Sequence, residues 1–151
     1  MSSWITIATS DLNDYLVAAQ VSALRSAALA PGQTDPFGRV MPDIAERIRM
    51  KIQSCANNQL SAVDNTIPPE LKWVACYLII EALQVRIPGL KLTDDQKNQV
   101  DRAVTQLDRI ADCKDKVSQP DDAVQPDVAG APLQIVCQPV RTTSRDTLQG
   151  I

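Results

Sequence analysis

An apolar segment bounded by prolines constrains the fold of this chain more than any other feature. Pro68 and Pro69 precede the segment, and Pro88 with Gly89 follows it. A proline at the first helical position costs little, so the pattern predicts a helix over residues 69–87. Residues 73–80 (WVACYLII) make this helix apolar on nearly every side, so other helices must cover it. Part of it could also face another subunit.

Three further helices are expected around this central one. Thr93 and Gln96 form the sequence pattern of a capping box, which predicts that a helix begins there and extends to about residue 111. Ile44, Ile48 and Ile52 recur every four residues and predict a helix over residues 42–63, opened by Pro42.

The N-terminal part predicts the remaining helix after a short extended segment. Thr9 and Ser10 are good N-caps, and the apolar pattern predicts a helix to about Leu29, with a possible kink or break within residues 17–21. Residues 30–42 read as a loop because they are rich in proline and glycine. The predicted fold class is therefore all-α, a small bundle of about four helices.

The composition changes after residue 117, which divides the chain into a helical domain (1–117) and a C-terminal part (118–151). Residues 118–132 contain three prolines and three aspartates, as in an extended linker. Beyond them, apolar and polar residues alternate like a strand that has no obvious mate in this chain.

The C-terminal part is predicted to be an arm that adds a strand to a partner or lies in a partner's groove. Ordering a residue costs about 1–2 kcal/mol, which a small helical domain cannot easily offset for so long a segment. A C-terminus without function is the alternative. The residues expected to bind the partner are Leu133, Ile135, Val140, Arg141, Arg145, Leu148 and Ile151.

Composition argues against most catalytic and metal-dependent functions. The chain has no histidine, and its cysteines at 55, 76, 113 and 137 lie 21, 37 and 24 residues apart, unlike zinc ligands. We therefore expect no enzymatic activity, no cofactor and no metal, and we expect reduced, buried thiols in a cytosolic protein. An enzyme that uses Cys76 or Glu81 would lack a partner residue in the sequence.

Charge and hydropathy limit the possible partners. The formal net charge is -3, which disfavours nonspecific DNA binding. The N-terminus does not resemble a signal peptide, and the longest apolar run is far below the roughly 20 residues that span a bilayer, so we expect a soluble protein without membrane contact. Arg47, Arg49 and Lys51 are expected on the exposed side of the second helix, where they could contact a nucleic acid or a neighbouring subunit, or could simply be solvated.

Several segments together resemble a known family. WITIATSDL, IAERIRMKIQSCANNQL and IPPELKWVACYLIIEAL, followed by a final amphipathic helix, look like the small helical head-to-tail connector (adaptor, or head-completion) proteins of tailed bacteriophages. The resemblance covers about residues 3–113.

The resemblance implies a structural protein of the virion neck, assembled in the host cytoplasm. About a dozen copies would form a ring on the portal protein, extend the DNA channel, and present a platform for a tail or stopper protein. DNA would pass through without specific binding, and the C-terminal extension would grip the portal or neighbouring subunits. The alternatives are a stopper or tail-completion protein of the same neck, or a helical regulator that binds DNA or a protein.

Overall fold

The computed structural model describes residues 3–26, 32–87 and 91–123, and these residues are mostly helical. The predicted all-α class is confirmed for them, since they contain no β-strand and only two isolated β-bridges. Nothing after residue 123 belongs to the described residues, so the predicted arm lies outside them. The α-helices are α1 (Ala18–Ser26), α2 (Phe37–Gln53), α3 (Lys72–Gln84) and α4 (Asp94–Ala111), and the 3-10 helices are η1 (Thr9–Asp14) and η2 (Pro69–Leu71).

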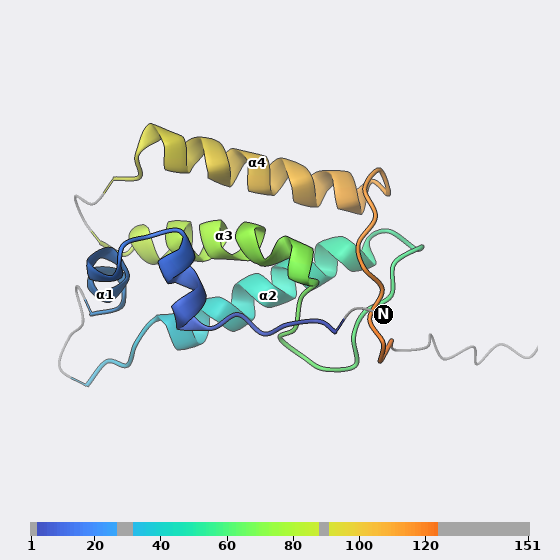
Figure 1. Cartoon of the computed structure of the whole chain (residues 1–151), viewed down its shortest axis with the longest axis horizontal. Helices are drawn as coiled ribbons and strands as arrows, with labels where there is room; N and C mark the ends of the chain where they lie inside the picture. The colour runs from blue at the N-terminus through green and yellow to red at the C-terminus, as the bar shows by residue number, and fades with distance from the viewer. Residues whose placement is uncertain (1–2, 27–31, 88–90, 124–151) are drawn as a thin grey trace, which may run out of the picture.

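Helix α3 lies at the centre of the bundle, as its apolar sequence predicted (Figure 1). It packs between α2 and α4, and α1 and η1 cover part of its remaining surface. Trp73 and Tyr77 are half-buried, and the ring of Tyr77 meets that of Tyr15 edge to face at 5.3 Å between centroids. The chain's own helices therefore cover most of α3. Its buried residues are Val74, Ala75, Cys76, Leu78, Ile79, Ile80, Leu83 and Gln84.

The predicted starts of the third and fourth helices are confirmed. The Thr93 hydroxyl accepts a hydrogen bond from the Gln96 N–H at 3.3 Å, and the Gln96 side chain accepts one from the Thr93 N–H at 3.0 Å. These two bonds form the capping box at the beginning of α4. At the other helix, Pro69 begins η2, which continues directly into α3.

The predicted limits of the second helix were wrong at both ends. Helix α2 begins at Phe37, five residues before Pro42, and the Asp35 carboxylate accepts a hydrogen bond from the Phe37 N–H at 2.9 Å in an Asx turn that precedes the helix. Pro42 lies inside the helix and removes one backbone donor. The helix ends at Gln53, ten residues before Val63, and a loop of residues 54–68 follows.

The first helix is divided, as the sequence allowed. Helix η1 ends at Asp14 and α1 begins at Ala18, so the break lies slightly before the expected residues 17–21. The extended segment before η1 is confirmed, and it pairs with the chain: Ile5 and Ile67 form an isolated antiparallel bridge with N···O distances of 2.8 and 2.9 Å.

Candidate assembly site at the root of the C-terminal segment

Three segments far apart in the sequence meet at one end of the bundle. They are the N-terminal residues 4–7, the loop 54–68, and residues 117–123, which we call the root segment because the predicted arm follows it. Figure 1 shows the root segment in orange beside the N-terminus, at the end away from α1. The indole N–H of Trp4 donates a hydrogen bond to the Ser118 carbonyl at 3.0 Å, which joins both described ends of the chain.

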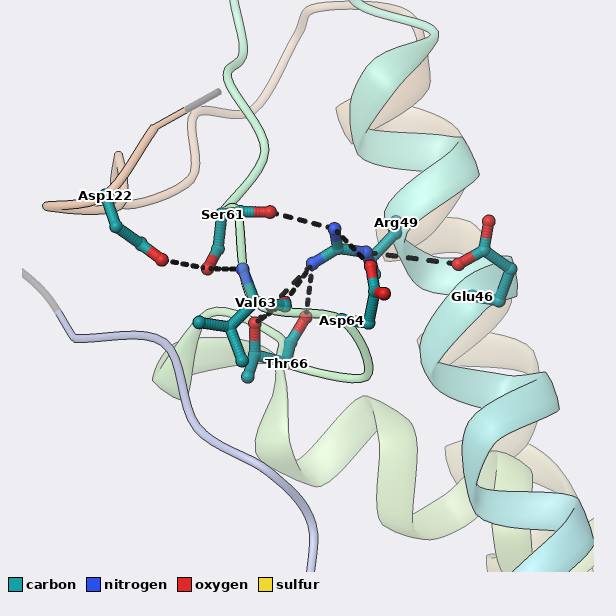
Figure 2. Close-up of polar contacts among 7 residues, drawn as sticks. All are labelled: Glu46, Arg49, Ser61, Val63, Asp64, Thr66 and Asp122. Atoms are coloured by element: carbon teal, nitrogen blue, oxygen red, sulfur yellow. Dashed lines mark hydrogen bonds and ion pairs between the residues drawn. The ribbon is translucent and has the colours of Figure 1, made fainter. Parts of the chain in front are cut away.

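Arg49 organises this site from within the bundle (Figure 2). Its guanidinium donates hydrogen bonds to the carbonyls of Ser61 at 2.9 Å, Val63 at 3.1 Å and Thr66 at 3.2 Å. The residue is only 6% exposed, so the prediction that Arg49 lies on an exposed face was wrong. Arg49 holds the loop after α2 because a guanidinium supplies several donors in a fixed planar arrangement.

The positive charge of Arg49 is balanced by the dipoles of the three carbonyl groups and by two carboxylates at longer distance. Glu46 and Asp64 lie 4.0 and 3.9 Å from guanidinium nitrogens, and both of their side chains are exposed. The guanidinium carbon lies 5.8 Å from the centre of the Trp4 ring. Trp4 therefore contacts both Arg49 and the root segment, since its indole nitrogen binds Ser118.

Ser61 connects the Arg49 cluster to the root segment. Its hydroxyl donates to the Asp122 carboxylate at 2.8 Å, while its carbonyl accepts from Arg49 (Figure 2). The Ala62 N–H donates to the Asp122 carbonyl at 3.1 Å, and Ser61 forms an isolated antiparallel bridge with Ala123. The last described residues are thus paired with the loop.

The rest of the root segment is also fixed to the helical unit. The Ser118 N–H donates to the Glu70 carboxylate at 2.5 Å, and the Gln59 N–H donates to the Gln119 side chain at 2.9 Å. Val117 is buried. Residues 118–123, which the sequence assigned to a linker, therefore pack against the helical unit.

A disulfide between Cys55 and Cys113 supports the same end of the bundle. Cys55 follows α2 and Cys113 follows α4, so the bond joins the C-terminal ends of two helices that run in the same direction (Figure 1). The prediction of reduced thiols was wrong for these two residues, because their separation in the sequence gave no sign that the helix ends meet. Cys137 lies outside the described residues.

Cys76 agrees with the prediction of a buried free thiol. Burial, together with the nearby Asp11 carboxylate, raises the pKa of Cys76 to about 12. The thiol is therefore protonated at neutral pH, which makes it a poor nucleophile.

The remaining predicted site residues do not form one surface. Arg47 is exposed on α2, whereas the Lys51 ammonium pairs with the Asp108 carboxylate of α4 at 2.7 Å. The predicted basic stripe is thus divided among an exposed residue, a buried one and one that joins two helices. The expected partner-binding residues outside the described part are Leu133, Ile135, Val140, Arg141, Arg145, Leu148 and Ile151.

A pocket of about 270 Å³ lies beside the root segment. Trp4, Thr66 and Asp122 are among its lining residues. Within residues 3–26, 32–87 and 91–123, no group of three or more histidine, cysteine, aspartate or glutamate side chains could hold a metal ion. No helix in these ranges is long and apolar enough to cross a membrane.

Comparison with known proteins does not identify a family, because no protein-family model, curated protein or solved structure matches the chain. The site therefore has to be interpreted from its own contacts. It contains a buried arginine, a disulfide and a fixed chain exit, an arrangement that can hold and direct a segment of chain.

Proposed function

We propose that this chain is a structural assembly protein whose helical unit directs a C-terminal arm onto a partner. The observation that carries the proposal is the fixed root segment, in which Asp122 and Ala123 pair with Ser61 and Ala62. Fixing the exit defines where the following residues 124–151 begin, so less freedom is lost when they bind. A segment rich in alternating apolar residues gains its order together with the assembly.

The particular assembly that we propose is the neck of a tailed bacteriophage. Copies of the chain would form a ring between the portal protein and a tail or stopper protein, and DNA would pass through the channel without specific binding. The function is binding alone, without catalysis or a cofactor. A stopper or tail-completion role in the same neck remains the alternative within this class. The proposal rests on the sequence resemblance, the helical bundle and the fixed root segment.

The described residues do not support the alternative hypothesis that the chain is a DNA-binding regulator. It depended on an exposed row of Arg47, Arg49 and Lys51, but Arg49 is buried and Lys51 pairs with Asp108. We therefore expect no steep salt dependence of binding to duplex DNA, because few of these charges are free to displace counterions.

The proposal is tested by measuring the mass of the assembled protein. The full chain, alone and with the portal protein of its own virus, should give a ring complex of fixed stoichiometry in native mass spectrometry. A chain that stays monomeric in both mixtures would contradict the proposal.

A pair of neighbouring substitutions tests the role of the root segment. Asp122→Ala removes the acceptor of the Ser61 hydroxyl, whereas Asp121→Ala removes an equal charge from a neighbouring residue that is exposed like Asp122 but accepts no hydrogen bond from the described residues. A hydrogen bond to a charged group is worth about 1.5–3 kcal/mol, so Asp122→Ala should weaken ring assembly at least tenfold. Asp121→Ala should leave assembly within about twofold, and equal effects of the two changes would count against a role for the fixed exit.

A further inference from the structure

A second site lies at the opposite end of the bundle, in a groove between α1, α3 and the beginning of α4. Its floor is apolar and includes Leu16, Leu24 and Ile80, with Ala23 at its edge. The groove encloses about 100 Å³. Apolar cavities of similar size hold a small hydrocarbon group, so this one has room for a leucine or isoleucine side chain.

Gln84 gives this groove a polar contact point. The residue is only 8% exposed and lines the groove, yet no described residue makes a hydrogen bond to its side-chain amide. No buried side-chain nitrogen or oxygen of the described residues lacks a partner, so the amide atoms of Gln84 are accessible from the groove, where they can bind a ligand's backbone. Gln20 and Gln96 add further amides at the mouth.

We infer that this groove receives the C-terminal arm of a second copy of this chain, and that Leu133 fills its apolar floor while Ile135 packs at its edge. The inference rests on the proposed function and names the surface to which the arm binds. Residues two apart share one face of an extended strand, so Leu133 can enter the groove and Ile135 can pack against its edge while Gln134 faces outward. The Gln84 amide then pairs with the arm's backbone.

The position of the root segment favours binding of the arm to the groove of a second copy over binding to the groove of its own copy. The root lies at the N-terminal end of α3, where Ser118 bonds to Glu70, whereas the groove lies at the C-terminal end, beside Ile80 and Gln84. Helix α4 runs between the two ends, and its length is about 27 Å.

The arm's reach makes its own groove a poor target. Ten residues separate Ala123 from Leu133, so the intervening chain spans at most about 33 Å when fully extended. To reach its own groove, the arm would have to lie almost straight along the outer face of α4, where Asp101 and Arg102 are exposed and offer no apolar track. In a head-to-tail arrangement, the root of one copy meets the groove end of the next, and repetition of this contact closes a ring.

Photo-crosslinking within the assembled full chain tests this inference. Copies that carry p-benzoylphenylalanine in place of Gln20, at the groove mouth, are mixed with nitrogen-15-labelled copies that lack it. Irradiation should link position 20 to peptides from residues 132–151 of the labelled copies. The matched control places the same amino acid at Gln53, which is exposed at the end of α2, at the opposite end of the bundle, and does not line the groove. It should give less than a tenth of that yield.

Two substitutions on α1 provide a second measurement. Ala23→Arg places a long charged side chain at the edge of the groove, and Ser22→Arg places the same side chain on the neighbouring exposed position outside it. Ala23→Arg should reduce the crosslinking from position 20 to the arm at least tenfold, and Ser22→Arg should leave it within about twofold.

The outcomes separate this inference from the proposed function. A ring that forms without crosslinks from position 20 to the arm overturns the inference and leaves the proposed function intact, as do crosslinks from position 20 to the portal protein alone. Crosslinks from position 20 to unlabelled arms alone also overturn it. They show that the arm binds the groove of its own copy. Failure of any ring to form, with or without portal protein, contradicts the proposed function itself.

Discussion

At the scale of single residues, the buried Arg49 has the largest expected effect on stability. In Arg49→Met, the carbonyls of the buried residues Ser61 and Thr66 lose their donor, whereas the Val63 carbonyl keeps its hydrogen bond from the Thr66 hydroxyl. We expect the free energy of unfolding to fall by about 3–5 kcal/mol, because each buried acceptor left without a partner costs about 1–3 kcal/mol. Urea unfolding, followed by fluorescence of the nearby Trp4, measures this change.

Arg47→Met is the matched control, since it removes the same charge from an exposed position on the same helix. It should change the free energy of unfolding by no more than about 0.5 kcal/mol. Equal losses in the two variants would show that Arg49 acts only through its charge.

Asp11 should make the stability of the N-terminal region depend on pH. Burial raises the pKa of Asp11, but hydrogen bonds from Lys72 and from the Ala8 N–H outweigh burial and lower the pKa below 3.8. The ionised carboxylate therefore stabilises the folded state above about pH 4, and this contribution is lost as the pH falls through the lowered pKa.

Asp11→Asn should accordingly cost about 1 kcal/mol at pH 7, and the difference from the unaltered chain should shrink as the pH falls through the lowered pKa of Asp11. Asp14→Asn is the control, because Asp14 also pairs with Lys72 but its side chain is 63% exposed. Thermal unfolding across this pH range distinguishes the two. A difference that persists at pH 2 would mean that the Asp11 carboxylate acts through something other than its charge.

At the scale of helices, the disulfide between the ends of α2 and α4 should be a major stabilising link. It closes a loop between residues separated by 58 positions, for which the chain-entropy relation gives about 4 kcal/mol. Reduction with dithiothreitol should therefore lower the free energy of unfolding by about 2–4 kcal/mol in urea titrations.

The control for this measurement is the double variant Cys55→Ala with Cys113→Ala. Its stability should be low with or without dithiothreitol, since Cys76 is the remaining cysteine among the described residues and is already a free thiol. If dithiothreitol destabilised the double variant as much as the unaltered chain, the effect of reduction would have to come from elsewhere.

The helices could be predicted from the sequence where a local signal sets their ends. The capping box of Thr93 and Gln96 and the prolines before α3 act through neighbouring atoms, so both starts were predicted. The start of α2 was missed although Asp35 and Pro36 precede Phe37, because Pro42 seemed a stronger signal. Its end was missed because the apolar spacing continues to Leu60, whereas the helix ends at Gln53, and the Asn58 side chain donates a hydrogen bond to the Ile52 carbonyl of its last turn at 3.3 Å.

The candidate site was predictable only in part, because most of its contacts join distant residues. Arg49 follows Ala45 by four positions and precedes Ile52 by three, so helical spacing already placed it among buried residues. The bond from Ser61 to Asp122 spans 61 positions, and no local pattern announces it. The change of composition at residue 118 predicted an extended linker, but composition does not show which surface such a segment contacts, and residues 118–123 pack against the helical unit.

At the scale of the whole molecule, the root segment implies that two truncations will behave differently. A chain ending at residue 123 keeps the contacts of Ser118, Gln119 and Asp122, so its free energy of unfolding should match that of the full chain within about 0.5 kcal/mol. A chain ending at residue 116 loses those contacts together with the buried Val117, and it uncovers Trp4. It should lose about 3–5 kcal/mol, since burial of one large apolar side chain and several hydrogen bonds disappear.

Both truncated chains lack the arm, so neither should assemble as the full chain does, although only the shorter one should be less stable. Urea unfolding measures the first property and native mass spectrometry measures the second. This separation decides the role of residues 124–151. If the chain ending at residue 123 formed rings as well as the full chain, the arm would be dispensable for assembly, and the fixed exit at Asp122 would serve only to stabilise the helical unit.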